Sequence, residues 1–360
     1  MRYYSLHITD PKTGQMLSPT PSGGFAFGNG EFTFSSLGRL PFTGQVVSDP
    51  GALNIEFDVP VSQLAKPQGS SRIKIWGPGL QMLGQASQLA GMNVQLSAGM
   101  YRGLPLATQQ TVHAGVVLKG SIFQAFGNWE GTNQTLDMLV LPGPPGAKGN
   151  IFDRPVSFSW PAGTPVADAI AAALQATLPE FKTQIEITTN FVLPYDETGF
   201  YANPSQWAGY ILGLTQPLGK KLLGFDYPGV KIAATGDTIY VFDGPRQPLK
   251  PVALQFEDFI GQPTWISGTS VQFNTVLRAD LGLGNAVKFP TDIVSPYALT
   301  SPTVISPGNT PVNSKIAFRG TFTTTEVHHY ANFRDSDAMS WVTAITASYN
   351  AGSGPVPSLS

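Results

Sequence analysis

Several stretches in the first third of the chain alternate between apolar and polar residues. From Leu53 to Val59 every second residue is apolar, which is the period-2 pattern of a strand with one buried face. Arg72–Trp76 is predicted as a second short strand. Val116–Ala125 and Thr135–Leu141 are predicted to pair as strands across a polar turn at Gly127–Gln134. This part of the chain is therefore predicted to be rich in β-structure.

Helical spacing occurs in three places. Leucines within Leu80–Leu89 predict a short helix that ends at Gly91. Farther along, Thr164-Pro165 predicts an N-cap and a first-turn proline for a helix over residues 166–178, in which apolar residues recur every four positions. A third helix is predicted to begin at Asn203-Pro204. The strands predicted around the last two helices are Val156–Trp160, Gln184–Thr188, Val230–Ala233 and Thr238–Phe242.

The last third returns to strand patterns. The predicted strands are Val252–Phe256, Ser270–Leu277, Lys315–Thr324 and Ser340–Ser348. A proline-rich loop over Ser295–Asn313 separates the second of these from the third. Loops of this length without secondary structure are usually functional or form contact arms.

Together these patterns predict an α+β fold that is mainly β. The predicted units are a first β domain with one short helix (1–145), an α+β insert (150–248), a second β domain (250–350) and a C-terminal tail (351–360). Pro142–Gly146 marks the linker before the insert, because this run of prolines and glycines joins neither a helix nor a sheet ladder.

The two β sections carry similar short motifs. The first pair is Leu53–Pro60 and Val252–Ile260; the second is Lys119–Ile122 and Arg319–Phe322, each followed by an asparagine next to an aromatic residue. A glycine inside a strand commonly marks a bulge or a close backbone approach. We interpret the pairs as a duplicated β module. Three chains would then present six modules, a route from three-fold to quasi-six-fold symmetry.

Composition adds to this picture. Charged residues are only 12% of the 360, whereas glycine (39) and proline (31) are abundant, which favours an assembly subunit whose neutral surface is covered by partners. The net charge of −2 and the lack of basic runs argue against a nucleic-acid-binding face. The absence of cysteine excludes disulfides and thiolate chemistry. The N-terminus lacks the apolar stretch of a signal peptide, and no membrane-spanning run occurs, so assembly in a cytoplasm is expected.

The strongest catalytic candidate is His328-His329 with Glu326, Asp335 and Asp337 nearby, a set of metal-binding residue types. Consecutive residues of a strand point to opposite faces, so the two histidines cannot ligate one metal without distortion. A polar hairpin tip is the favoured interpretation.

Paired carboxylates are the next candidates. Glu56 and Asp58 share one strand face about 7 Å apart, a separation that glycosidases use. Glu257-Asp258 is a second pair, but no aromatic sugar platform accompanies either. Acids that are solvated or line a lumen are favoured, and in a tube they would repel passing DNA.

Other chemistry-bearing residues fit no known site. Gly282–Asn285 and Gly143–Gly149 do not lie between a strand and a helix of a βαβ unit, so phosphate binding is not expected. His7 and His113 are interpreted as packing or surface residues, and the six dispersed tryptophans as core or interface anchors. No residue is assigned a catalytic, cofactor-binding or metal-ligating role, and the chain is predicted not to be an enzyme.

Five segments resemble the baseplate hub proteins of contractile-tailed phages, especially those of Mu-like type. They follow one another in the family's order along most of the chain: Ile73–Gly77, Gly120–Trp129, Leu193–Tyr201, Phe256–Trp265 and Glu326–Arg334, the last continuing to Ser340-Trp341. The proline-rich loop before Lys315 has no counterpart that we can place.

The resemblance implies two tail-tube-like β-barrel domains flanking a mixed α/β insert. It implies a homotrimer whose ring links the tail tube to the central spike and provides a conduit for genome ejection during host entry. The implied partners are the spike protein, tail tube or tube-initiator proteins, and baseplate wedge or ring proteins. Phage DNA would be present only in transit, with no membrane insertion and no cofactor. The implied location is the virion tail baseplate, after assembly in the host cytoplasm. The alternatives are a tail-associated cell-envelope hydrolase and a receptor-binding module.

Overall fold

In the computed structural model the described residues are 1–28, 30–39, 43–44, 46–65, 70–100, 113–144, 153–223, 227–244, 251–266, 270–290 and 321–349. The described chain is mainly β and contains one large sheet that is almost wholly antiparallel, in agreement with the strand patterns. The proline-rich loop at 295–313 and the tail from 351 lie outside these residues, as does most of Gly143–Gly149. Within the described part of the chain, no helix is long and apolar enough to cross a membrane.

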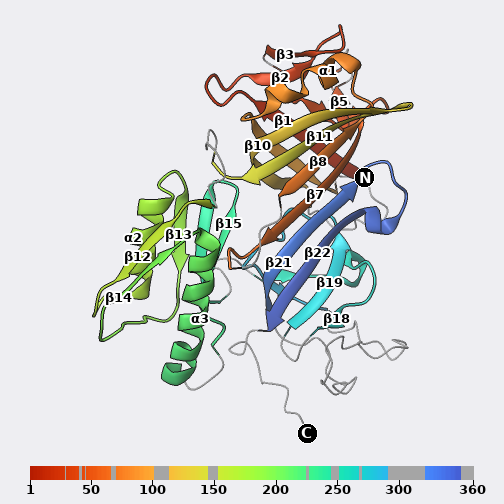
Figure 1. Ribbon diagram of the computed structural model, residues 1–360. Helices are drawn as coiled ribbons and strands as arrows, with labels where there is room; N and C mark the ends of the chain where they lie inside the picture. Colours follow the sequence, from red (N-terminus) through yellow and green to blue (C-terminus); the bar gives the residue numbers. More distant parts are fainter. Residues whose placement is uncertain are drawn as a thin grey trace.

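The large sheet joins strands from both ends of the chain (Figure 1). Its main path runs in the order β18-β19-β22-β21-β7-β8-β11-β10-β9-β1-β2-β3. Off this path, β4 pairs with β1, β20 pairs with β21, and β17 pairs with β20. The strands of its first half are β1 (Arg2–Thr9), β2 (Met16–Pro19), β3 (Phe25–Gly28), β4 (Phe34–Ser35), β7 (Asn54–Ser62), β8 (Ser71–Trp76), β9 (Asn93–Met100), β10 (Gly115–Glu130) and β11 (Asn133–Pro142). A separate pair, β5 (Leu37–Arg39) and β6 (Val46–Ser48), lies nearby.

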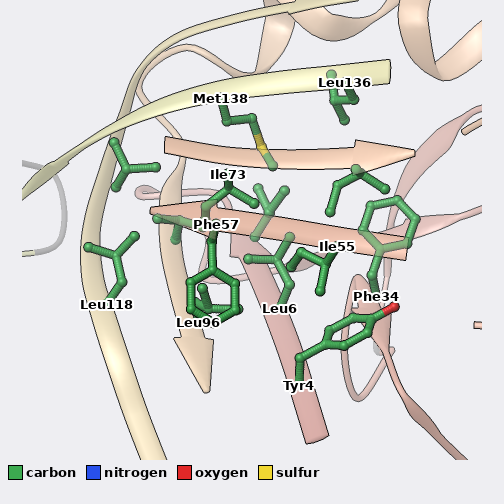
Figure 2. Close-up of a cluster of buried hydrophobic side chains, with 14 of the residues drawn as sticks. Tyr4, Leu6, Phe34, Ile55, Phe57, Ile73, Leu96, Leu118, Leu136 and Met138 are labelled. Carbon is green, nitrogen blue, oxygen red and sulfur yellow. The ribbon is translucent and has the colours of Figure 1, made fainter. Parts of the chain in front are cut away.

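The first half of the sheet curves around an apolar core (Figure 2). In β7 the apolar positions predicted from the alternation, Ile55, Phe57 and Val59, are all at most 1% exposed. Complete burial of such a side chain contributes about 1.5–3 kcal/mol. The period-2 pattern therefore predicts β7 and its buried face correctly.

A short helical segment covers one end of this core. The predicted helix over 80–89 is in fact an α-helix, α1 (Leu80–Gly84), followed by a 3-10 helix, η1 (Ala86–Leu89). The turn after η1 contains Gly91 with φ +83°, a conformation that favours glycine. A Cβ placed on Gly127 of β10 would lie 2.8 Å from the Cβ of Leu83, so α1 packs directly on the strand backbone.

The hairpin of β10 and β11 is longer than the sequence predicts. The predicted turn at 127–134 is wrong, because β10 continues to Glu130 and β11 begins at Asn133. Gly131 at φ +58° makes the tight turn possible. The expected close approach at Gly120 is confirmed, since a Cβ placed on this glycine would lie 2.1 Å from the carbonyl oxygen of Leu141.

Residues 153–244 form mixed α and β structure around a core of their own. Its elements are β12 (Val156–Trp160) paired with β14 (Glu197–Tyr201), the three-stranded sheet β13 (Lys182–Glu186), β16 (Thr238–Phe242) and β15 (Lys231–Thr235), and the helices α2 (Val166–Thr177) and α3 (Pro204–Leu223). Figure 1 shows these elements beside the large sheet.

Two boundaries in this region differ from the prediction. The N-cap of α2 is Pro165 rather than Thr164, because Pro165 forms an isolated β-bridge with Val192 and its backbone stays extended. The strand predicted at 184–188 begins and ends two residues earlier, as β13. The predicted hairpin on either side of Gly236 is confirmed as β15 and β16.

The second half of the large sheet is built from residues after 250. Its elements are β17 (Val252–Ala253), the 3-10 helix η3 (Phe256–Asp258), β18 (Thr264–Trp265), β19 (Ser270–Val276), β20 (Ala286–Lys288), β21 (Thr321–Asn332), the 3-10 helix η5 (Ala338–Ser340) and β22 (Trp341–Tyr349). The predicted strand Val252–Phe256 is wrong beyond Ala253. There Asp258 accepts a hydrogen bond from the backbone N–H of Gln255 at 2.8 Å, which caps η3 instead. The predicted strand at 315–324 is described only from Thr321 onward.

One strand joins the two halves. Over residues 321–323, β21 pairs with β20 of its own half. Over residues 326–332 it pairs with β7 of the first half, in register Glu326↔Ser62 to Asn332↔Glu56. We call this β7–β21 contact the internal seam.

Candidate assembly surface

The face of the large sheet opposite the core is polar across the internal seam. One cross-strand row runs Tyr330, Asp58, Arg72, Leu139 and Gln124, through strands β21, β7, β8, β11 and β10. Side chains on one face of a sheet contact their cross-strand neighbours. The row therefore forms a continuous surface that belongs to both halves of the chain.

Basic residues accompany the acids that the sequence singles out. Glu56 lies beside Lys74, and Asp58 beside Arg72. The Trp76 indole N–H donates to Glu56 at 3.3 Å, and the Lys74 Nζ lies 4.9 Å from the centre of the Trp76 ring. The predicted acidic face is thus close to charge-balanced, because Lys74 and Arg72 come from the neighbouring strand.

Asp137 is the most buried charge of this polar face, at 1% exposed. It accepts hydrogen bonds from Arg72 at 2.6 Å, from the Asn128 amide at 3.1 Å and from Thr135 at 3.1 Å. A buried carboxylate is stable only where such partners are present. The group connects β8, β11 and the distal half of β10 on one face.

The two adjacent histidines point to opposite faces, as the strand geometry predicts. His328 is exposed and pairs with Asp58 across the internal seam. His329 is 4% exposed and shares a hydrogen bond with Thr343 at 3.0 Å. The pKa of His329 is lowered to about 4, mainly by burial and to a smaller extent by the neighbouring His328. Within the described part of the chain, no three His, Asp or Glu side chains gather as a metal site would require.

A buried ionic group lies between the two halves. Arg278 is 4% exposed and contacts Asp258 at 2.8 Å and Asp280 at 2.7 Å. His113, which precedes β10, lies 3.7 Å from Asp280. Burial raises the pKa of Asp280, but His113 and Arg278 outweigh it and hold that pKa below its ordinary value. Sequence reasoning missed this group, although a basic and an acidic residue two positions apart just after β19, Arg278 and Asp280, were a signal.

The structure does not bring the remaining candidates together. Of the pair Glu257-Asp258, only Asp258 is buried, with Arg278 as its partner. Gly284 lies in a turn with φ +76°, and its N–H donates to the carbonyl of Thr324. His7 contacts the Ser5 hydroxyl at 2.8 Å.

The described residues form several small cavities. One of about 220 Å³ lies where the sheet meets the α/β elements, and it is lined by Val59–Val61, Val116–Lys119 and Ala234–Asp237. Lys119 and Lys182 both pair with Asp237 beside it, at 3.5 and 3.1 Å. The Lys119 contact joins the α/β elements to β10, and the Lys182 contact lies within the α/β elements.

The hairpins β10–β11 and β21–β22 share a detail of construction. Each contains a bulge, between Ile122 and Gln124 in one and between Thr324 and Glu326 in the other. Before the bulge, β10 pairs with β9 and β21 with β20. Counted from the bulges, residues 124–130 of β10 correspond to residues 326–332 of β21.

This correspondence corrects the motif repeat seen in the sequence. The motifs align Ile122 with Phe322, whereas the bulges align Ile122 with Thr324. Arg319 and Gly320 lie outside the described residues. The alignment of Leu53–Pro60 with Val252–Ile260 is also wrong, because the latter segment contains η3 where β7 is a continuous strand.

Comparison with known proteins yields structural neighbours only. No family model and no curated protein matches the sequence. Its structural neighbours are tail proteins and secretion-system proteins. One is c3393 of Escherichia coli, described as a component of the type VI secretion system with structural similarity to the bacteriophage T4 tail proteins gp27 and gp5. It is 10% identical, with 86% of this chain and 78% of that chain covered and a TM-score of 0.48.

Two further neighbours are described as tail proteins. The tail protein from Neisseria meningitidis is 10% identical, with 96% of each chain covered and a TM-score of 0.46. The 43 kDa tail protein of prophage MuSo2 from Shewanella oneidensis is 6% identical, with 96% of this chain and 98% of that chain covered and a TM-score of 0.48. TM-scores below 0.5 do not establish a common fold, so the function must be argued from the chain's own geometry.

Proposed function

We propose that this chain is a structural, non-catalytic baseplate hub subunit of a phage contractile tail. In this proposal three copies form a ring with six similar β modules, which links the tail tube to the central spike. The observation that carries the proposal is the pair of matching hairpins, β10–β11 and β21–β22, in one continuous sheet.

The internal seam supports the ring. There, the edge of one half of the sheet pairs with the edge of the other over residues 326–332. In a ring of modules every contact repeats the same kind of edge-to-edge pairing. One chain would thus contain two adjacent members of a six-membered collar.

The polar face of the sheet fits the lining of a conduit. Glu56 and Asp58 alternate across strands with Lys74 and Arg72. DNA that passes such a face meets neither a strongly attractive nor a strongly repulsive field. Phage DNA in transit would therefore not adhere to the wall.

The domain organisation belongs to the same proposal. Residues 1–145 and 250–350 would supply the two tube-like modules, and residues 150–248 would lie outside the ring. There they would contact the spike, the tube initiator or wedge proteins. In this arrangement the chain acts by shape, in the tail of the virion.

The test is the mass and symmetry of the assembled chain. Light scattering after size exclusion, alone and with the spike protein of the same tail, is expected to give three times the 38.3 kDa chain mass. Electron microscopy is expected to show a ring with quasi-six-fold symmetry around a central hole. A monomer in both samples, or a monomer that degrades peptidoglycan, would refute the hub and favour an envelope hydrolase.

A further inference from the structure

The distal half of β10 has a partner strand on one side only. Residues 124–130 pair with β11, and β9 pairs only with the residues from 115 to 121. Within the described part of the chain, no strand pairs with the other edge of 124–130. The corresponding residues of β21 are 326–332, and they are paired on both sides. One neighbour is β22, which corresponds to β11, and the other is β7. We call residues 124–130 the open edge.

An open strand edge exposes backbone N–H and C=O groups that readily pair with another chain. The aromatic side chains around this edge are also exposed: Phe123 by 56%, Phe126 by 37% and Trp129 by 64%. Ala331, which corresponds to Trp129 in the internal seam, is 0% exposed. Large exposed aromatics beside an unpaired edge are typical of an interface.

The strand that fits the open edge follows from the registers. Along the first half, Gln124 pairs with Leu139, Leu139 with Arg72, and Arg72 with Asp58 of β7. These pairings place β7 three strands away from β10.

The second half repeats this path. Glu326 pairs with Thr346, Thr346 with Gln272, and Gln272 with Thr264 of β18. Strand β18 is thus the counterpart of β7. It is the first strand of the sheet path, which runs on through β10 to β9, β1, β2 and β3. Because β7 is the partner of β21 in the internal seam, β18 is the expected partner of β10.

We propose that the open edge of one copy of this chain pairs with β18 of a second copy, antiparallel and in the register of the internal seam. In that seam Tyr330 pairs with Asp58. Their counterparts are Asn128 and Thr264, which therefore face each other across the two chains. Only the closure of this contact at three copies rests on the proposed hub function; the contact itself follows from the pairing within one chain.

Head-to-tail pairing of unlike edges generates a ring or a filament and not a two-fold dimer. It also accounts for Trp129. In the internal seam Ala331, the counterpart of Trp129, pairs with Phe57. The counterpart of Phe57 is Pro263, directly before β18. Trp129 of one copy therefore packs against Pro263 of the next. The 64% exposure of Trp129 in the single chain would be lost in the assembly.

A disulfide trap tests the register. The chain contains no cysteine, so an introduced pair is the only thiol chemistry present. Directly paired residues of antiparallel strands have Cα atoms about 4.5–5.5 Å apart, within the range of a disulfide. Oxidised protein with both Asn128→Cys and Thr264→Cys is expected to run as a covalent trimer on a denaturing gel without reductant.

Three controls accompany the trap. Each single-cysteine variant is expected to give no covalent trimer. The pair Gln124→Cys with Thr264→Cys is displaced by about 13 Å along the strand and is expected not to cross-link. The pair Asp58→Cys with Tyr330→Cys is expected to form a disulfide within one chain and to leave the gel mass unchanged.

A side-chain variant gives a second measurement. Trp129→Ser is expected to raise the dissociation constant of the assembly by about 30-fold or more, the effect of removing an anchoring tryptophan. Phe200→Ser, at a residue 74% exposed on β14, is the matched control and is expected to leave association unchanged.

The outcomes separate this inference from the hub proposal. A trimer by light scattering that does not cross-link through 128 and 264 refutes the strand pairing and leaves the hub standing. Equal cross-linking of the displaced control refutes the register. A covalent ladder that extends beyond three copies supports the pairing and refutes closure at three. A chain that stays monomeric, with or without the spike protein, refutes both.

Discussion

The hairpins β10–β11 and β21–β22 are built alike and have different surroundings. Both carry a bulge after the segment that pairs within their own half. Beyond the bulge, β21 continues along β7, whereas β10 extends past its last partner on one side. Two hairpins of similar construction thus have different neighbours, so the sequence of a strand does not specify which strand pairs with it. The partner depends on which other edge the fold brings alongside.

The two regions also differ in how they bury charge. In the first half, buried Asp137 is paired with Arg72, whose side chain is 52% exposed. In the second half, Arg278 is 4% exposed between Asp258 and Asp280. Removing the partner of a buried ion lowers the free energy of unfolding much more than removing the partner of an ion that water reaches. The second half is therefore expected to depend more strongly on its ionic contacts.

The largest expected effect is that of Arg278→Met. This change leaves two acidic side chains without their cation, and the free energy of unfolding is expected to fall by about 3–5 kcal/mol. Urea unfolding followed by circular dichroism measures it. The matched change Arg72→Met is expected to cost less, about 1–2 kcal/mol, because buried Asp137 keeps the hydrogen bonds from Asn128 and Thr135 and the nearby Lys74. Equal losses in the two variants would contradict the difference between the regions.

A smaller effect is expected from protonation of His329, which occupies the position that Gly127 has in the first hairpin. Its pKa is about 4 in the folded chain, against 6.5 for an ordinary histidine. The histidine in the unfolded chain binds a proton more readily than buried His329. The free energy of unfolding is therefore at its full value above pH 6.5 and decreases as the pH falls toward 4. Between pH 7.5 and 5 the loss is expected to be about 2 kcal/mol.

The variant His329→Asn removes this titration and retains a polar group that can reach Thr343. Between pH 7.5 and 5 the free energy of unfolding decreases in both proteins. The decrease in the variant is expected to be about 2 kcal/mol smaller than the decrease in the parent chain. Urea unfolding at both pH values measures the difference. The same pH dependence in both proteins would show that other groups cause it.

The smallest expected effect is at the internal seam itself. Asp58→Asn removes the charge that pairs with His328, but both side chains are about half exposed, at 52% and 47%. An exposed ion pair contributes about 0–1 kcal/mol, so the free energy of unfolding is expected to fall by less than about 1 kcal/mol. A loss of several kcal/mol would mean that the ion pair holds the seam, rather than the strand pairing of β7 with β21.

Local patterns predicted much of the fold. The alternation around Phe57 predicted β7, and the proline before Val166 placed the start of α2 to within one residue. The failures occurred where strand pairing or a side-chain cap overrode the pattern of polar and apolar residues. The polar stretch after Gly127 continues as strand because β11 pairs with it, and the residues after Ala253 turn into η3 because Asp258 caps them.

By itself, the sequence determined which residues are buried in strands and helices, and that His328 and His329 lie on opposite faces, because side-chain periodicity is a local property of the backbone. Only the tertiary structure decided that Arg278 lies between two acids, that Arg72 and Lys74 balance Glu56 and Asp58, and that β21 pairs with β7. Each of these includes at least one contact between separate elements of the chain, whose approach is governed by sheet order and register. Periodicity carries no information about either.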